Sequence, residues 1–398
     1  MIFLNTLGFG IVVPLLPFYG RSFHAPAWVV ALIFSAYSAG AFFGEPFWGR
    51  LSDRYGRKPL LVWTVCGNAL CYLSLAFAPT AWAALAIRFI GGLTSGNNAI
   101  VQGYIADVTP PERRARTMSY VGAAANVGFI VGPAIGGLFV RPSAGPAGFQ
   151  LPLFIAAGMF AVTAVAIGLL LREGRRERAS VAVARFGPVL RQAMSDPVVG
   201  RMLLLSLLSG SAFTGIESVF GLWTQARFAW GPREVGLCFA AVGVASALSQ
   251  TLVTGPLSER FGEGRTLAAG MTLAMVGSAL QPLSPAPWVT TALLAVTAVG
   301  WSVAFPNVGA LISRATDPDH QGQVLGANNA ANALARVVGP LFAGLTFSGV
   351  SVNAPFLQGA LLTAPAIWLA LRTARLVGEA RRVSAEVEPA VQAPTRGL

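Results

Sequence analysis

Three pairs of short motifs recur in this sequence at nearly the same separation. The first pair is GRLSDRYGRK at 49–58 and GPLSERFGEGR at 255–265, offset by 255 − 49 = 206 residues. The others are Gly132-Pro133 with Gly339-Pro340 (339 − 132 = 207) and Thr109-Pro-Pro-Glu112 with Thr316-Asp-Pro-Asp319 (316 − 109 = 207). Because the three pairs share one offset, the chain is predicted to contain two copies of one folded unit.

The apolar content of the sequence places both copies in a lipid bilayer. Hydrophobic residues make up 54% of the 398 residues and charged residues only 11%, against about 25% charged residues in soluble domains. A membrane-spanning helix needs roughly 20 apolar residues. Such segments are predicted at 2–20, 27–48, 59–79, 81–104, 117–140, 150–171, 198–224, 233–255, 265–284, 287–312, 322–348 and 353–374. We therefore expect an all-α integral membrane protein with twelve transmembrane helices.

The duplication divides these helices into two pseudo-symmetric six-helix halves. Residues 1–171 are expected to form the first half and residues 198–378 the second. Residues 172–197, which begin with a run of arginine and glutamate, are expected to form a cytoplasmic central loop, and residues 379–398 a disordered cytoplasmic tail. Two tandem membrane halves with a binding site between them are typical of carriers.

The positions of the basic residues predict the orientation in the membrane. Loops after even-numbered spans carry basic clusters, whereas those after odd-numbered spans hold only Arg21, Arg141, Arg227 and Arg233. By the positive-inside rule, the even-numbered loops and both termini are cytoplasmic. We expect a multi-pass protein of a bacterial-type inner (plasma) membrane. The net charge of +12 follows from the same bias, so nucleic acid is not needed as a partner.

Residues suited to catalysis or metal binding are sparse. The two histidines, His24 and His320, lie in predicted loops, and the three cysteines, Cys66, Cys71 and Cys238, lie within predicted spans. The sequence indicates no Ser/His/Asp constellation, no disulfide framework and no metal-ligand spacing. We expect no enzymatic activity, no cofactor and no bound metal.

Several motifs resemble those of a known transporter family. Gly49-x3-Asp53-Arg54-x-Gly56-Arg57-Lys58 is similar to the cytoplasmic motif of the major facilitator superfamily. Arg88 and Gly128-x3-Gly132-Pro133-x2-Gly136-Gly137 resemble two motifs of its drug/proton antiporters. Phe3-Leu4-x3-Gly8-x-Gly10-x3-Pro14-x2-Pro17, Tyr104-Ile-Ala-Asp107-x-Thr109, Gly236-x11-Ser249-Gln250 and Gln321-Gly322-Gln323-x2-Gly326 resemble the tetracycline/proton antiporter group. The resemblance covers nearly the whole chain and implies a twelve-helix fold that exports drugs in exchange for protons.

The motif at 49–58 also has a physical interpretation as a conformational latch. Gly49 and Gly56 permit close backbone approach at a tight turn. Asp53 can point at the positive N-terminal end of a neighbouring helix and so fix one half against the other, while the basic residues stay near water and lipid phosphates. The residues assigned to this latch are Gly49, Asp53, Arg54, Gly56, Arg57, Lys58, Asp107, Glu45 and Arg336. The alternative is a basic turn without a conformational role, which the second copy at 255–265 disfavours.

A second motif lies in the predicted fifth span. Gly128, Gly132 and Gly136 are spaced at i, i+4 and i+8, which forms a smooth stripe suited to close helix packing. Pro133 is expected to bend the helix, and Gly137 completes the motif. A role in antiport follows only from the resemblance.

Two ionisable residues within predicted spans are assigned to proton coupling. A charge that faces lipid costs at least about 2.5 kcal/mol, so Arg88 and Glu217 are expected to face the interior of the bundle. The resemblance ties Arg88 to proton coupling, and the alternative is a structural strut that pairs with a carboxylate. Glu217 lies among aromatic residues, which favour the neutral form of a carboxyl. It could therefore alternate between binding a proton and binding a cationic substrate. The alternative is a structural pair with Arg336.

Aromatic and amide side chains on central helices complete the predicted substrate cavity. They are Asn5, Phe9, Phe220, Trp223, Trp301, Phe305, Asn307, Asn328 and Asn329. Amides are uncommon in spans and are expected to line the cavity. At three positions where the tetracycline group carries acidic residues, this sequence has Asn5, Cys71 and Ala274, a departure that favours a different substrate.

The sequence therefore predicts a monomeric carrier that exports small amphipathic, drug-like compounds while protons enter. Its expected partners are the small-molecule substrate, protons and the lipid bilayer. The alternative is a carrier of a metabolite, such as a sugar or an organic anion, because a fold does not dictate its substrate. A membrane sensor that does not transport would be expected to lose the latch charges, yet Asp53, Arg57 and Arg88 are all present.

Overall fold

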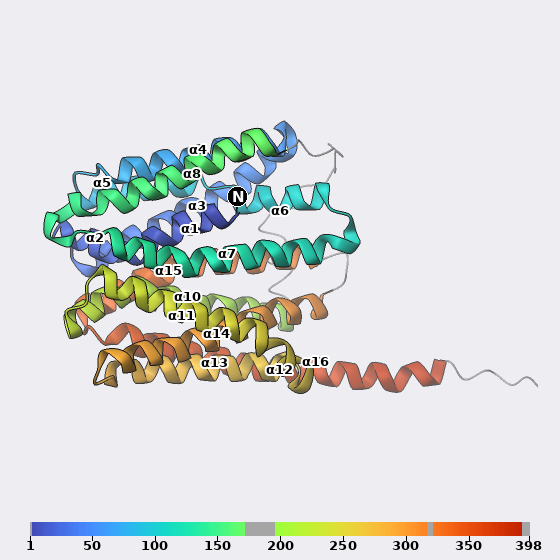
Figure 1. Cartoon of the computed structure of the whole chain (residues 1–398). Helices are drawn as coiled ribbons and strands as arrows, with labels where there is room; N and C mark the ends of the chain where they lie inside the picture. The colour runs from blue at the N-terminus through green and yellow to red at the C-terminus, as the bar shows by residue number, and fades with distance from the viewer. Residues whose placement is uncertain (1, 172–195, 317–320, 392–398) are drawn as a thin grey trace, which may run out of the picture.

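The computed structural model describes residues 2–171, 196–316 and 321–391, which form helices joined by turns and contain no strand (Figure 1). The first half consists of α1 (Ile2–Val12), η1 (Val13–Leu15), α2 (Leu16–Ser22), α3 (Ala27–Tyr55), α4 (Arg57–Leu75), α5 (Ala81–Leu93), α6 (Asn97–Val108), α7 (Pro111–Phe139), η2 (Pro142–Phe149) and α8 (Gln150–Leu170). The second consists of α10 (Pro197–Phe228), α11 (Pro232–Leu252), α12 (Thr254–Phe261), α13 (Glu263–Leu280), η3 (Gln281–Leu283), α14 (Pro287–Ala315), α15 (Gln321–Gly349) and α16 (Ala354–Val391).

The helices match the predicted spans closely. In the described part of the chain, 10 segments are long and apolar enough to cross a bilayer, and each coincides with a predicted span. The remaining two predicted spans, 59–79 and 81–104, correspond to α4 and to the pair α5 and α6. The prediction of an all-helical, multi-span membrane fold is confirmed.

The structure describes most of the predicted C-terminal tail but little of the predicted central loop. Most of the predicted central loop, 172–197, lies outside the described residues. The helix α16 continues to Val391 and extends past the other helices (Figure 1). Residues 379–391, which the sequence predicts to be disordered, are therefore helical, and 392–398 lie outside the described residues.

Glycine forms the same tight turn in both copies of the motif. Gly56, with φ of 107°, separates α3 from α4, and Gly262, with φ of 81°, separates α12 from α13. This region of backbone conformation is accessible to glycine at little cost because glycine has no Cβ. The duplicated motif thus places a sharp turn at the equivalent end of each half.

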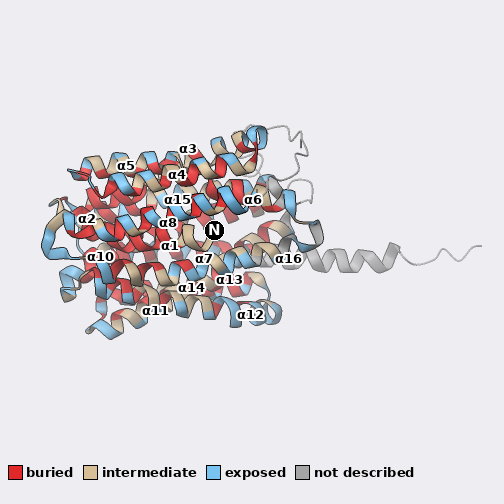
Figure 2. Cartoon of the chain, turned by 45° about the horizontal axis from the view of Figure 1, so that its top comes forward, coloured by how far each residue is buried: buried red, intermediate tan, exposed pale blue. Residues whose placement is uncertain are grey.

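Large apolar side chains lie on the outside of the bundle as well as in its interior, and Figure 2 marks the exposed and buried residues along the helices. Trp63, Leu170 and Leu361 are 71%, 81% and 74% exposed, whereas Phe220 and Trp223 are fully buried. An apolar outer surface of this extent is favourable in lipid and would promote aggregation in water. The exposure pattern therefore agrees with a membrane location.

The halves contact each other mainly through α3 with α15 and α7 with α11, and less extensively through α10 with α2, η1 and α3 and through α11 with η1. The Ser35 hydroxyl of α3 donates to the Val337 carbonyl of α15 at 3.0 Å. Gly137, near the end of α7, lies against Pro232 at the start of α11. The contacts of Ser35 and Gly137 lie toward the end of the bundle that contains the turn at 23–26, which the basic residues predict to be extracellular, whereas the Asn126 side chain of α7 donates to Gln250 near the other end of α11 at 3.1 Å.

Candidate transport site

Arg57 is the centre of the ion-pair cluster formed by the motif at 49–58. Its guanidinium lies 2.6 Å from the Asp53 carboxylate and 2.9 Å from the Asp107 carboxylate. It also packs against Gly103 of α6, where an added Cβ would lie 2.5 Å from the guanidinium carbon. The end of α3, the start of α4 and the end of α6 are therefore tied together within the first half.

The other latch residues lie around this cluster. Asp53, which the sequence predicts to point at the N-terminal end of a neighbouring helix and so to fix one half against the other, is exposed and pairs with Arg57 in its own half. The Arg54 guanidinium lies 5.5 Å from the centre of the Tyr55 ring. Gly49 packs against α6, Gly56 forms the turn, and Lys58 lies in the first turn of α4.

The second half has an ion pair at the equivalent place with the charges interchanged. Glu263 at the start of α13 pairs with Arg314 at the end of α14. These residues are offset from Arg57 and Asp107 by 263 − 57 = 206 and 314 − 107 = 207. Sequence reasoning missed this pair because neither position keeps its residue type, although the common offset would have located both.

The glycine stripe of α7 packs against α1. An added Cβ on Gly128, Gly132 or Gly136 would overlap backbone atoms of α1. Gly137 and the Pro133 carbonyl instead lie against α11 of the second half. The motif therefore lies between α1 and the other half, where only small residues fit.

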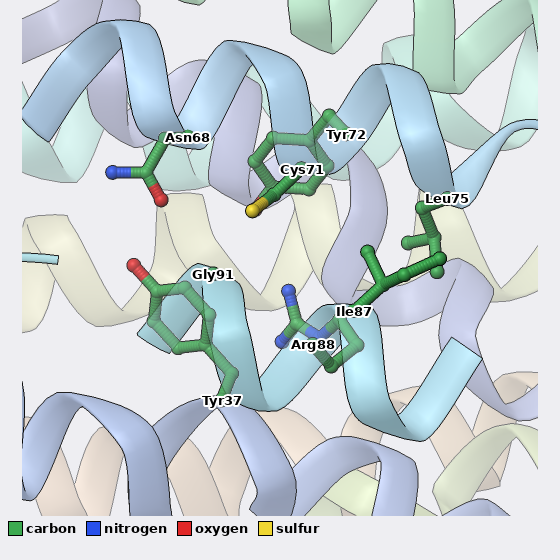
Figure 3. A pocket seen from close by; sticks show the side chains of 8 residues that line it. All are labelled: Tyr37, Asn68, Cys71, Tyr72, Leu75, Ile87, Arg88 and Gly91. Carbon is green, nitrogen blue, oxygen red and sulfur yellow. The ribbon is translucent and has the colours of Figure 1, made fainter. Parts of the chain in front are cut away.

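Arg88 lies in a small pocket between α3, α4 and α5 (Figure 3). Its side chain is buried, and its guanidinium carbon lies 4.6 Å from the centre of the Tyr37 ring, a cation–π contact. Cys71 of α4 lines the same pocket. Within the described residues, no carboxylate lies within ion-pair distance of Arg88.

The predicted fourth span is interrupted beside this pocket. α5 ends at Leu93 and α6 begins at Asn97. The Trp48 indole donates a hydrogen bond to the Leu93 carbonyl at 2.8 Å, and the Tyr37 hydroxyl donates to the Ser95 hydroxyl at 3.0 Å. The backbone and side-chain groups at the break are thus bonded to α3, as groups within a membrane must be.

Three charged residues lie across the boundary between the halves. Arg336 of α15 interacts electrostatically with Glu45 of α3 and with Glu217 of α10. The Asn98 side chain of α6 lies near Glu45. In the described part of the chain, Arg336 forms no direct ion pair with either carboxylate. It is an exposed cation with one carboxylate of each half nearby.

The predicted cavity amides differ in their environments. Asn328 of α15 accepts a hydrogen bond from Ser206 of α10 at 2.6 Å, and Asn329 beside it is exposed. Asn307 is buried, and its side chain donates to the backbone of its own helix. Asn5 of α1 is partly exposed.

The predicted cavity aromatics fall into separate groups. Trp301 and Phe305 of α14 contact Phe213 of α10, with ring centres 4.9 Å and 6.0 Å apart. Phe9 of α1 contacts Tyr37 at 5.6 Å. The first group lies in the second half and the second group beside Arg88.

Phe220 and Trp223 have a different environment from the one predicted. Both are fully buried, and the Trp223 indole donates to the Asn353 side chain at 2.8 Å and packs against Phe356. In this conformation they belong to the core of the second half, where Phe356 of α16 packs against Trp223 and Phe239 of α11 packs against Phe220.

Sequence reasoning missed the polar residues around Arg88, namely Tyr37, Asn68 and Tyr72. Isolated tyrosines and an asparagine in apolar spans give no periodic signal. The interruption at 94–96 had a visible signal, because Thr, Ser, Gly and two Asn occur in succession and all have low helix propensity.

Comparisons with known proteins agree with this architecture. The family model of the Major Facilitator Superfamily matches residues 1–231 and 202–396. The class C tetracycline resistance protein of Escherichia coli is 31% identical over 347 residues, 85% of each chain. Multidrug resistance protein 2 of Bacillus subtilis (strain 168) is 25% identical over 367 residues, 89% of each chain.

A solved structure shows the same fold. The crystal structure of the human organic anion transporter MFSD10 (TETRAN) matches with a TM-score of 0.69 at 23% identity, covering 93% of this chain and 96% of that one. Because the family consists of transporters, the prediction of a carrier in place of an enzyme is confirmed. With two helical halves and a family match along nearly its whole length, this chain is a multi-pass membrane protein of the Major Facilitator Superfamily.

Proposed function

We propose that this chain exports small, amphipathic, drug-like compounds from the cytoplasm in exchange for protons by alternating access. The observation that carries the proposal is the position of Arg336 near Glu45 of the first half and Glu217 of the second. A cation shared by two carboxylates responds to protonation of either one, because neutralising one leaves it attracted to the other alone. Relatives named for tetracycline and multidrug resistance support efflux.

The proposed cycle uses the contact between the halves. The contacts of Ser35 and Gly137 with the second half lie toward the predicted extracellular end, which supports a conformation that would admit a substrate from the cytoplasm. A substrate bound near Glu217 would compete with Arg336 for that carboxylate. After the halves close at the cytoplasmic end, a proton from outside would neutralise Glu217 and release the substrate. A monomer suffices for this cycle.

The aromatic and charged side chains of the second half favour lipophilic substrates that are neutral or singly cationic. Phe213, Trp301 and Phe305 form an aromatic group, and aromatic faces attract cations. Glu217 supplies one negative charge. Ala274, at a position where the tetracycline group carries an acid, is buried on α13. We therefore propose dyes and amphipathic drugs as substrates ahead of metal-chelated tetracycline.

A drug-susceptibility panel tests this function. Expression in an efflux-deficient bacterium is expected to raise tolerance of cationic dyes and amphipathic drugs several-fold over an empty vector, and a proton uncoupler is expected to remove dye efflux. Tetracycline tolerance is expected to change little, because Asn5, Cys71 and Ala274 carry no charge. Strong, magnesium-dependent tetracycline protection without protection against dyes would overturn the proposed substrate class.

The latch is tested separately by Arg57→Ala and Asp53→Asn. Loss of the Arg57 guanidinium leaves the Asp53 and Asp107 carboxylates without their shared cation, so both variants are expected to insert normally and to lose efflux, with Arg57→Ala the more severe. Arg141→Ala, which removes an exposed arginine at the predicted extracellular end, is the control. Efflux at the wild-type rate by both inserted variants would show that the cluster is only structural.

A further inference from the structure

Three polar atoms around Arg88 have no protein partner. They are Asn68 Oδ1, the Tyr72 hydroxyl oxygen and Arg88 Nε, on side chains that are 1%, 3% and 5% exposed. All three residues line the same pocket. The Tyr72 hydroxyl lies near the Arg88 guanidinium, but without the geometry of a hydrogen bond. Buried polar atoms are nearly always hydrogen-bonded, to protein or to ordered water, so three in one pocket require an explanation.

The hydrogen-bonding character of these atoms defines the ligand that they would bind. The Asn68 amide nitrogen donates to the Thr64 carbonyl at 3.1 Å, which leaves Asn68 Oδ1 as an acceptor. Arg88 Nε can only donate, and the Tyr72 hydroxyl can donate. The Asn68 oxygen would repel an anion, and the Arg88 guanidinium would repel a cation. A neutral ligand that accepts two hydrogen bonds and donates one satisfies all three atoms.

The size of the pocket limits which neutral ligand can bind there. It has a volume of about 10 Å³ for a water-sized sphere, close to the ~10–15 Å³ that one water molecule needs. Figure 3 shows the Asn68 oxygen, the Cys71 sulfur and the Arg88 guanidinium turned toward the space between α4 and α5. Leu75 and Ile87 line the pocket beside them and offer no polar group.

We propose that this pocket is a binding site for one resident water molecule, which bridges α4 and α5 through Asn68, Tyr72 and Arg88. The water hydrates Arg88 inside the membrane without neutralising it, so Arg88 remains a net positive charge in the first half. Tyr37 covers one face of the guanidinium, and the water satisfies Nε at its edge. This site does not depend on the proposed efflux function.

Radiolytic footprinting of the full chain in lipid nanodiscs tests whether water occupies the site. X-ray pulses generate hydroxyl radicals from bound water, and these radicals oxidise adjacent side chains even when they are buried. Tyr72 and Tyr19 are both 3% exposed, but the Tyr19 hydroxyl is bonded to the Leu75 carbonyl at 2.6 Å. Tyr72 is expected to be oxidised several-fold faster than Tyr19. Equal, slow oxidation of the two would overturn the proposal.

Two substitutions at one glycine separate loss of the water from steric disturbance. An added Cβ on Gly91 would lie 3.3 Å from Cys71 Cβ and 3.8 Å from the Tyr37 ring, so Gly91→Ala places a methyl group in the pocket with a small adjustment. Gly91→Ser adds the same carbon together with a hydroxyl that can replace the water oxygen.

Gly91→Ala is expected to reduce Tyr72 oxidation to the Tyr19 level and to lower the melting temperature by about 2 °C, because the water's hydrogen bonds are lost. Gly91→Ser is expected to reduce Tyr72 oxidation to the same extent, but its melting temperature is expected to lie closer to that of the wild type. Unchanged Tyr72 oxidation in Gly91→Ala, or equal melting temperatures of the two variants, would overturn the water site.

Discussion

Replacement of Glu217 by glutamine is expected to abolish proton-driven efflux while the protein still folds and keeps more of its substrate binding than with Glu217→Lys. Glutamine keeps the size of the side chain and can hydrogen-bond, but it can neither release a proton nor attract Arg336 as a charge. The shared cation would then interact with Glu45 alone. In everted membrane vesicles, an imposed proton gradient should no longer drive dye accumulation above the level of vesicles without the transporter.

Glu234→Gln is the matched control for this experiment. Glu234 is exposed and accepts a hydrogen bond from the Gly231 amide at the start of α11, a role that glutamine can also fill. Its vesicles should accumulate dye as the wild type does. If Glu217→Gln vesicles accumulate dye at the wild-type rate, Glu217 has only a structural role and the coupling proposal fails.

Replacement of Gly92 by alanine is expected to prevent the first half from folding correctly. α3 and α5 cross with their backbones in direct contact, and a Cβ on Gly92 would overlap the Tyr37 carbonyl and lie 2.8 Å from the Ala41 amide nitrogen. Backbone atoms inside helices cannot move aside as a flexible side chain can. Overpacking of this kind costs roughly 3 kcal/mol or more, a large part of the stability of a typical domain.

The measurement is fluorescence-detected size-exclusion chromatography of tagged protein, followed by thermal melting in detergent. Gly158→Ala is the control, because a Cβ at Gly158 on the exposed side of α8 would meet no atom within 4 Å. That change should be neutral or slightly stabilising, since alanine favours helix more than glycine does. A monodisperse Gly92→Ala peak with the wild-type melting temperature would contradict the predicted clash.

The fold could be predicted from the sequence because its strongest determinants are local and repeated. Each span requires only a run of apolar residues, and the common offset of the motifs shows that the halves are related. The glycine turn at Gly56 and its copy at Gly262 follow from the same comparison. Such features depend on composition and spacing, which are visible without knowledge of the tertiary contacts.

The site could be predicted only in part, because its contacts join residues far apart in the chain. Arg57 and Asp107 belong to separate motifs, and their pairing depends on how α4 and α6 pack. The interruption after Leu93 requires α3 to supply Trp48 as a hydrogen-bond donor. The sequence predicts Trp223 to line the cavity, but Phe356 of α16 packs against it and it is buried. A tertiary contact of this kind leaves no local signal in the sequence.

The close crossing of α3 and α5 has a mechanical consequence. Gly92 leaves no side chain between the two helices, so their backbones are in direct contact. We therefore expect little sliding or separation between α3 and α5, which should move as one rigid unit. Ser35 bonds α3 to the other half, and Tyr55 ends α3 20 residues later (55 − 35 = 20), about 30 Å along the axis at ~1.5 Å per residue. A tilt of about 10° at Ser35 would therefore displace the Arg57 cluster by ~5 Å. A small rotation where the halves touch is thus amplified at the opposite face of the membrane.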